Sequence, residues 1–255
     1  MNRKLILVIL ISLMCLPCWA GVVCDGDDSI GLNIHDDLAG KNIYTIQLWM
    51  SASSYATNAV GLSFGFGSDT SATLILYPYD SVNGNGFRVY FNTNSELDLN
   101  SQSIADGKPH SFVMVSRGAL DREFYVDGVS VGTQTSFNDT ISASSSSSFV
   151  CRWAGGQFGT GNVYQVDVWK AALNAQEVLQ ISKSLNKSIA LQVQTTPSTN
   201  KLIQSLRFNE YPNGKLLNGL PFTDYSSIGN NSGNGSDGAN NVGMTSVSEA
   251  KLNYP

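Results

Sequence analysis

The sequence predicts an all-β fold, an antiparallel β-sandwich with one short helix towards its C-terminal end. Short stretches of alternating apolar and polar residues recur between residues 44 and 132, with Gly, Asn and Asp turn residues between them and no segment of helical periodicity. Only 14% of the residues are charged, while Gly, Ser, Asn and Thr are abundant. This composition is typical of an extracellular β protein rather than of a cytosolic enzyme.

The stretch 106–132 organises the predicted sheet. Its apolar residues alternate with polar ones on both sides of Asp127-Gly128. Asp-Gly suits a two-residue hairpin turn, because both central positions need positive φ and these residues adopt it at least cost. The expected cross-strand pairs are Val126–Val129 and Phe124–Val131. One face of this sheet should then be buried, while Glu123 and Tyr125 point the other way.

Four earlier stretches alternate in the same way, and we expect a strand in each: 44–50, 62–66, 74–77 and 87–91. In the first, one face should carry Tyr44, Ile46, Leu48 and Met50. All of 24–132 would then be a meandering antiparallel sheet. We expect the Asn-rich segment 92–100 to be turn-like and the Ser-rich run 144–148 to be a surface loop.

Three segments resemble a known family. The segment Asp106-Gly-Lys-Pro-His110, with a hydrophobic strand after it and a strand ending in Tyr125-Val-Asp-Gly-Val129, is similar to the middle of laminin G-like and pentraxin-like domains of the concanavalin A-like lectin/glucanase superfamily. Cys24–Leu32 is similar to their opening strand, and Gly155–Val178 to their closing strand and helix start. The resemblance covers residues 24–185 and implies a jelly-roll sandwich.

The predicted helix has a start signal of its own. Asn174 is a candidate N-cap, and Glu177 three residues later completes a capping box. Val178 and Ile181 would form the apolar side of this short helix.

Residues 1–20 are predicted to be a signal peptide. Arg3 and Lys4 precede an apolar run at 5–16, and the ending Cys-Trp-Ala fits cleavage after Ala20. The apolar run is shorter than the ~20 residues that a membrane span needs. We therefore expect an exported chain that is secreted, periplasmic or at the cell surface, without a membrane span in its mature part.

We expect one concanavalin A-like jelly-roll domain over residues 21–193. Residues 194–255 should comprise a linker and a Gly/Asn-rich segment that packs on the sandwich. Within it, 205–209 alternates, and a tail with so few core residues seldom folds alone. Residues 201–210 are therefore predicted to add a strand to the sandwich.

The charge of the chain excludes one class of partner. The formal net charge is −5 and becomes −7 when the signal peptide takes away its two positive residues, Arg3 and Lys4. No basic stripe is left for nucleic acid or anionic lipid. A glycan or a protein surface remains as the expected partner, and the sequence does not set an oligomeric state.

Two of the four cysteines, at positions 15 and 18, would leave with the signal peptide. Cys24 and Cys151 remain. An even count in an oxidising compartment predicts a disulfide between them.

The superfamily includes glucanases, and a match to their catalytic strand is incomplete here. That strand reads Glu-x-Asp-x-x-Glu, with one carboxylate as nucleophile and one as acid/base. Glu96 and Asp98 match the first half, but Ser101 and Gln102 stand where the second Glu should be. We expect no catalytic residues and interpret Glu96 and Asp98 as solvent-facing residues at a strand end. A glycan-degrading enzyme with an incomplete carboxylate pair is the alternative.

The resemblance also implies ligands. Many relatives bind Ca²⁺ through loop carboxylates, for which the candidates here are Asp27, Asp28 and Asp167, although no loop of fixed ligand spacing contains them. Strand aromatics could stack on sugar rings, and the candidates are Tyr77, Tyr79, Trp153 and Tyr164. Packing is the other interpretation of these aromatics. His35 and His110 have no partners at catalytic spacing and are interpreted as structural.

The sequence thus predicts an exported, non-enzymatic recognition module that binds carbohydrate or a protein surface. A structural domain of a larger extracellular assembly is a third hypothesis. Fold alone does not decide between them.

Overall fold

The computed structural model describes the chain in separate stretches. These are residues 19–25, 28–32, 38, 40–51, 62–65, 74–77, 86–91, 95–100, 104, 106–135, 147–151, 160–183, 202–208, 235–236 and 245–249. Only the backbone is described at 19–20, 62–65, 74–77, 86–88, 90–91, 95–100, 147–149, 235–236 and 245–249.

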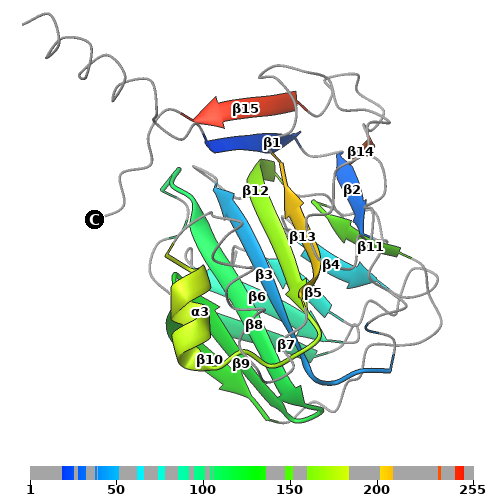
Figure 1. Cartoon of the computed structure of the whole chain (residues 1–255), viewed down its shortest axis with the longest axis vertical. Helices are drawn as coiled ribbons and strands as arrows, with labels where there is room; N and C mark the ends of the chain where they lie inside the picture. Colours follow the sequence, from blue (N-terminus) through cyan, green and yellow to red (C-terminus); the bar gives the residue numbers. More distant parts are fainter. Residues whose placement is uncertain are drawn as a thin grey trace, which may run out of the picture.

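The described strands form two antiparallel sheets (Figure 1). The eight-stranded sheet contains β1 (Trp19–Asp25), β3 (Tyr44–Ser51), β8 (His110–Gly118), β9 (Asp121–Val126), β10 (Val129–Gln134), β12 (Thr160–Trp169), β13 (Leu202–Arg207) and β15 (Thr245–Glu249). The seven-stranded sheet contains β2 (Ser29–Leu32), β4 (Leu62–Gly65), β5 (Leu74–Tyr77), β6 (Gly86–Phe91), β7 (Ser95–Asn100), β11 (Ser147–Val150) and β14 (Gly235–Ser236). The helix is α3 (Ala175–Ile181).

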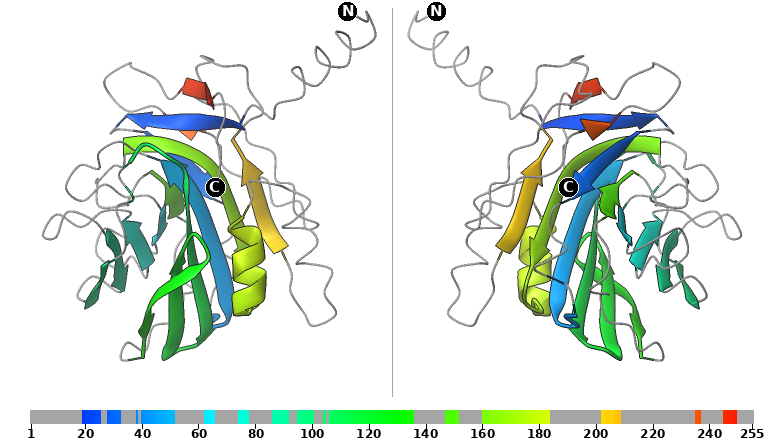
Figure 2. Two further views of the ribbon diagram at one scale, coloured as in Figure 1. Left: turned by 90° about the vertical axis from the view of Figure 1, so that its left-hand side faces the viewer. Right: turned by 90° about the vertical axis from the view of Figure 1, so that its right-hand side faces the viewer.

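Strand order shows a jelly-roll sandwich, as predicted. The first sheet runs β10-β9-β8-β3-β12-β1-β15, and the second β14-β2-β11-β4-β5-β6-β7. In the first sheet, β12 pairs with β3 along one edge and with β1 and then β13 along the other. Figure 2 shows the seven-stranded sheet on one side of the eight-stranded sheet and α3 on its other side.

The β9–β10 hairpin forms at the predicted turn. Asp127 and Gly128 have φ values of 51° and 80°, in the positive region that such a turn requires. The first cross-strand pair is the predicted one. The second prediction, Phe124–Val131, is wrong, because a bulge in β10 places Gly132 opposite Phe124. The extra residue of a bulge shifts every later pair by one position.

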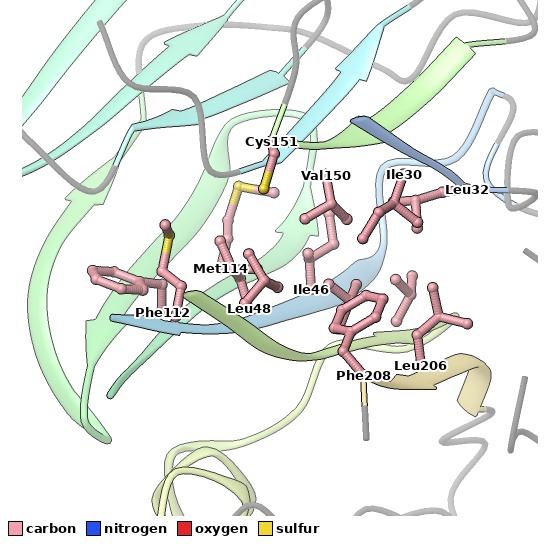
Figure 3. Close-up of a cluster of buried hydrophobic side chains, with 14 of the residues drawn as sticks. Ile30, Leu32, Ile46, Leu48, Phe112, Met114, Val150, Cys151, Leu206 and Phe208 are labelled. Carbon is pink, nitrogen blue, oxygen red and sulfur yellow. The ribbon is translucent and has the colours of Figure 1, made fainter. Parts of the chain in front are cut away.

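An apolar core fills the space between the two sheets (Figure 3). The predicted inward face of β3 belongs to it with Tyr44, Ile46, Leu48 and Met50. The seven-stranded sheet contributes Ile30, Leu32, Val89 and Val150. Burial of these side chains from water is the main force that holds the two sheets together.

The predicted disulfide is confirmed. Cys24 near the end of β1 is bonded to Cys151, which follows β11, with the two Cα atoms 6.2 Å apart. Because β1 and β11 belong to different sheets, this bond links the two halves of the sandwich covalently.

The outer face of the eight-stranded sheet is also buried, which corrects the prediction of one buried side. Tyr125, expected to point to solvent, is 2% exposed and belongs to a second apolar cluster with Val113 and Trp169. Val178 and Ile181 of α3 belong to the same cluster. The helix therefore covers apolar strand residues that would otherwise be exposed to solvent.

The start of α3 is the predicted capping box. The Asn174 side-chain oxygen accepts hydrogen bonds from the backbone N–H groups of Gln176 and Glu177, both at 3.0 Å. The Asn174 N–H donates to Glu177 Oε2 at 2.8 Å. These contacts satisfy N–H groups that have no partner within the helix.

Pairing between distant segments overrides four local predictions. Residues 24–132 are not one meander, because β3 lies between β8 and β12 while β2 lies in the other sheet. The segment 24–32 contains parts of two strands in different sheets rather than one opening strand. Residues 95–100 form strand β7, not a turn, because they pair along their whole length with β6. Residues 147–148 belong to β11 and not to a loop.

The C-terminal segment adds strands to both sheets. β13 pairs with β12, which confirms the predicted added strand, and all of 202–208 is buried. β15 pairs with β1, and β14 with β2. The domain boundaries at 20 and 193 stay predictions, and the predicted linker and nearly all of the predicted signal peptide lie outside the described residues. Within the described stretches, no helix is long and apolar enough to cross a membrane.

Candidate functional site

Strand register brings five chemically distinctive residues to one face of the seven-stranded sheet. Tyr77 of β5 pairs with Arg88 of β6, and Arg88 pairs with Asp98 of β7. In the adjacent row, Tyr90 pairs with Glu96. Directly opposite residues share a face, and so do residues two apart on one strand. These five positions are called the tyrosine face below.

Buried neighbours show which face this is. Val89 lies between Arg88 and Tyr90 in β6 and is fully buried in the core between the sheets. Successive residues of a strand alternate between the two faces, so the tyrosine face is the one turned away from that core. Among the described elements, neither the helix nor any strand lies over this side of β4–β7 (Figure 2).

The size of the tyrosine face follows from sheet geometry. Neighbouring strands are about 4.8 Å apart and residues two apart on a strand are about 6.6 Å apart, so three strands and two rows span about 10 by 7 Å. Tyrosine brings a flat apolar ring with a polar tip, arginine brings five hydrogen-bond donors, and ionised carboxylates bring only acceptors. This set suits a ligand with a flat apolar surface and several hydroxyl groups.

The disulfide lies at the same end of the seven-stranded sheet as Tyr77. Leu76 pairs with Leu62, and Leu62 pairs with Val150, the residue before Cys151. Tyr77 and Cys151 are therefore each one residue beyond this row of paired residues. The covalent link thus lies at this end of the sheet, beyond β11 and with β4 between it and β5.

A second polar cluster surrounds His110 at the start of β8. Its Nδ1 lies 2.7 Å from Asp127 Oδ2, and its Nε2 lies 3.1 Å from Asp106 Oδ1. The Ser111 N–H donates to Asp127 Oδ1 at 2.9 Å. Both ring nitrogens thus face carboxylates, an arrangement that only the doubly protonated imidazolium satisfies fully.

Burial by itself would lower the pKa of His110, but the hydrogen bonds and charges of Asp127 and Asp106 outweigh it, and the pKa is raised above its ordinary value. Gly128 at the tip of the same hairpin packs against α3, since a Cβ there would lie 2.9 Å from Leu179 Cδ1. The cluster therefore joins the loop before β8 to a hairpin tip that touches the helix. Its geometry fits the predicted structural role of His110.

Two of the four predicted ligand-contact residues, Tyr77 and Tyr164, lie within the described structure. Tyr77 is on the tyrosine face. Tyr164 is 3% exposed, its hydroxyl lies 2.8 Å from Ser51 Oγ, and its ring lies where a Cβ on Gly21 would be. Tyr164 could therefore reach a ligand only if the chain around it moved. Tyr79 and Trp153 lie outside the described residues, and their ligand contact stays a prediction.

Two of the three predicted calcium ligands, Asp28 and Asp167, lie far apart in the structure. Asp28 is buried, and its Oδ2 accepts the N–H of Asp25 at 2.9 Å. Asp167 is buried on β12, 3.3 Å from Arg207 of β13. Asp25 pairs with Thr160, seven residues from Asp167, which puts the two sites about 23 Å apart along the strand. Asp27 and His35 lie outside the described residues. Across the described part of the chain, no three His, Cys, Asp or Glu residues group as a metal site.

The family of the chain follows from these features together with a sequence match. A family model described as the concanavalin A-like lectin/glucanases superfamily matches residues 25–179, which is more than half of the chain. The chain belongs to this superfamily. The match begins in β1, ends in α3, and includes all five positions of the tyrosine face. No curated protein is similar enough in sequence to count as a relative.

Solved structures share the fold. A Bacteroides ovatus protein assigned as a carbohydrate binding protein is 12% identical, with a TM-score of 0.59, and the match covers 91% of this chain and 60% of that one. The CBM40 of the Ruminococcus gnavus IT-sialidase is 12% identical, with a TM-score of 0.50, over 64% of this chain and 97% of that one. A SAP-like pentraxin from Limulus polyphemus is 12% identical, with a TM-score of 0.43, over 66% and 77%. At these identities the likeness to the first two structures shows the fold alone.

Sequence reasoning missed Arg88 and Tyr90, although a signal for them was present. The alternating stretch 87–91 was assigned by its apolar residues Phe87, Val89 and Phe91. Strand alternation then places Arg88 and Tyr90 on the opposite face. What the sequence could not supply is the register that sets them beside Tyr77 and the two carboxylates.

Proposed function

We propose that this protein is an exported, non-enzymatic carbohydrate-binding module and that the tyrosine face is its sugar-binding surface. The observation that carries the proposal is the row Tyr77–Arg88–Asp98 beside the pair Tyr90–Glu96, on the face turned away from the core. Aromatic rings and convergent polar groups are what a polyhydroxylated ligand with apolar ring faces requires.

Two further observations support this function. The Bacteroides ovatus structure and the sialidase CBM40, both of the same fold, are named for carbohydrate binding. The Cys24–Cys151 disulfide fits an extracellular or periplasmic location, because such bonds persist in oxidising compartments. Cleavage after Ala20 would leave Gly21–Asp25 of β1, including the bonded cysteine.

The test is a glycan array on the mature protein, followed by calorimetric titration of the glycans that bind. Tyr77→Ala and Tyr90→Ala should each weaken binding about tenfold, equivalent to about 1.4 kcal/mol for the lost ring contact. Tyr77→Phe should retain most of the affinity, because the ring remains. Leu120→Ala is a matched control, since Leu120 is 48% exposed on the turn between β8 and β9 of the other sheet.

Circular dichroism melts of each variant show whether it is folded. The proposal fails if the array detects no glycan. It also fails if folded Tyr77→Ala and Tyr90→Ala variants bind as tightly as Leu120→Ala.

A glycan-degrading enzyme is the second candidate, and one observation favours it. Glu96 and Asp98 are two residues apart on β7 and share a face with Tyr77, so two carboxylates stand about 6.6 Å apart at the backbone. Retaining glycosidases need two carboxyl groups about 5–5.5 Å apart. Reducing ends released from β-glucans, alginate or galactans by the wild type, and not by Glu96→Gln, would favour the enzyme.

A further inference from the structure

We propose that the tyrosine face selects neutral glycans and discriminates against glycans that carry carboxylates. This inference rests on the proposed function and adds the class of ligand. It follows from the arrangement of the charged positions on the face and from the charge of the whole chain.

The only positive position of the tyrosine face is already opposite a negative one. Register places Arg88 directly opposite Asp98, where Cβ atoms are about 4.5–5.5 Å apart and opposite charges attract. Glu96 is the diagonal neighbour of Arg88, about 7–8 Å away. A ligand carboxylate at this face would therefore meet two negative positions for one positive position.

Hydrogen-bond chemistry favours the same class of ligand. Ionised Glu96 and Asp98 can only accept hydrogen bonds. Sugar hydroxyls donate, so a neutral glycan can satisfy both acids while its oxygen atoms accept from Arg88. The carboxylate of an acidic glycan is an acceptor only, so wherever it stands in place of a hydroxyl it offers these acids no donor. Discrimination between neutral and acidic glycans thus comes from the repulsion of Glu96 and Asp98 as well as from the hydrogen bonds that a neutral glycan can make.

The charge of the chain acts in the same direction at longer range. The formal net charge is −5 for the full sequence, so an anionic glycan approaches against the field of the protein. Two positive residues elsewhere in the described structure lie in ion pairs, Arg117 with Glu123 and Arg207 with Asp167. Salt screens such long-range repulsion.

The experiment compares two oligosaccharide panels on the mature wild-type protein. The neutral panel comes from cellulose, xylan, β-1,3-glucan and galactan; the acidic panel comes from alginate and polygalacturonate and includes sialyllactose. We expect the best acidic ligand to bind at least tenfold more weakly than the best neutral one at low salt. The difference should narrow at high salt, where the Debye length falls to about 3 Å.

Asp98→Asn and Asp121→Asn form a matched pair of variants. Each removes one negative charge, but Asp121 is an exposed residue of β9 in the other sheet. Asp98→Asn should reduce the neutral-to-acidic ratio at least threefold, because it removes the negative charge at the position opposite Arg88, while Asp121→Asn should leave the ratio unchanged.

Three outcomes would overturn the inference while leaving the proposed function standing. They are acidic glycans bound as tightly as neutral ones, a ratio that Asp98→Asn leaves unchanged, and an equal change with Asp121→Asn. Absence of binding to both panels would instead overturn the proposed function, and the inference with it.

Discussion

Removal of the Cys24–Cys151 bond by Cys24→Ser with Cys151→Ser should destabilise the protein strongly. The bond closes a sequence separation of 127 residues, and the loop-entropy expression then gives about 5 kcal/mol at 25 °C. The native sandwich is held by β ladders on both sides of the bond, and residual structure in the unfolded chain reduces the entropic gain. We therefore expect a loss of about 3–5 kcal/mol.

For a chain of this length, 1 kcal/mol corresponds to about 2–4 °C, so the melting temperature should fall by about 6–20 °C. The measurement is a thermal melt of exported wild type and of the double-serine variant, with mass spectrometry after alkylation to count free thiols. Wild type with a reductant is the control and should melt close to the double variant.

A double-serine variant that melts within about 2 °C of wild type would refute the reasoning. It would mean that the β ladders and the apolar core alone hold the two sheets together. Two free thiols in the exported wild type would contradict the bond itself.

Three further predictions concern the His110 cluster, the hairpin tip and the C-terminal strand. Since the folded-state pKa of His110 is raised, the stability that its protonation adds is fully present below its ordinary pKa of about 6.5 and is lost as pH rises through the folded value. Urea unfolding across pH 5–9 should show this loss of stability in wild type and not in His110→Gln. A parallel loss in both proteins would contradict the prediction. Gly128→Ala should lower the melting temperature more than Gly107→Ala does, because both positions have φ near 80° but only at Gly128 would a Cβ meet Leu179 and Ser182. The backbone strain that both variants share costs about 1 kcal/mol. An equal fall in the two variants would show that the contact between the hairpin and the helix is loose. A chain ended at Gln194 should melt at a lower temperature, because β13 and its buried apolar residues leave β12; an unchanged melting curve would mean that the tail does not stabilise the sandwich.

Local chemistry determined the features that need only a few neighbouring residues. The Asp127-Gly128 turn follows from the cost of positive φ, and the start of α3 from an Asn side chain three residues before a Glu. The disulfide followed from composition, because only Cys24 and Cys151 remain after the predicted signal peptide. The superfamily was recognisable for the same reason, since its motifs are short and contiguous.

Only the tertiary structure decided how distant segments pair and which faces they bury. Tyr125 shares its strand face with the polar Glu123 two residues earlier, yet it is buried because α3 packs on its side of the sheet. Residues 95–100 look turn-like, yet β6 provides a pairing partner along their whole length. The tyrosine face depends on this register: a shift of one residue in β6 would exchange Arg88 for Val89 beside Tyr77. Alternation along a strand is local, but the choice of register is made by burial of the whole sheet, and no short stretch of sequence contains it.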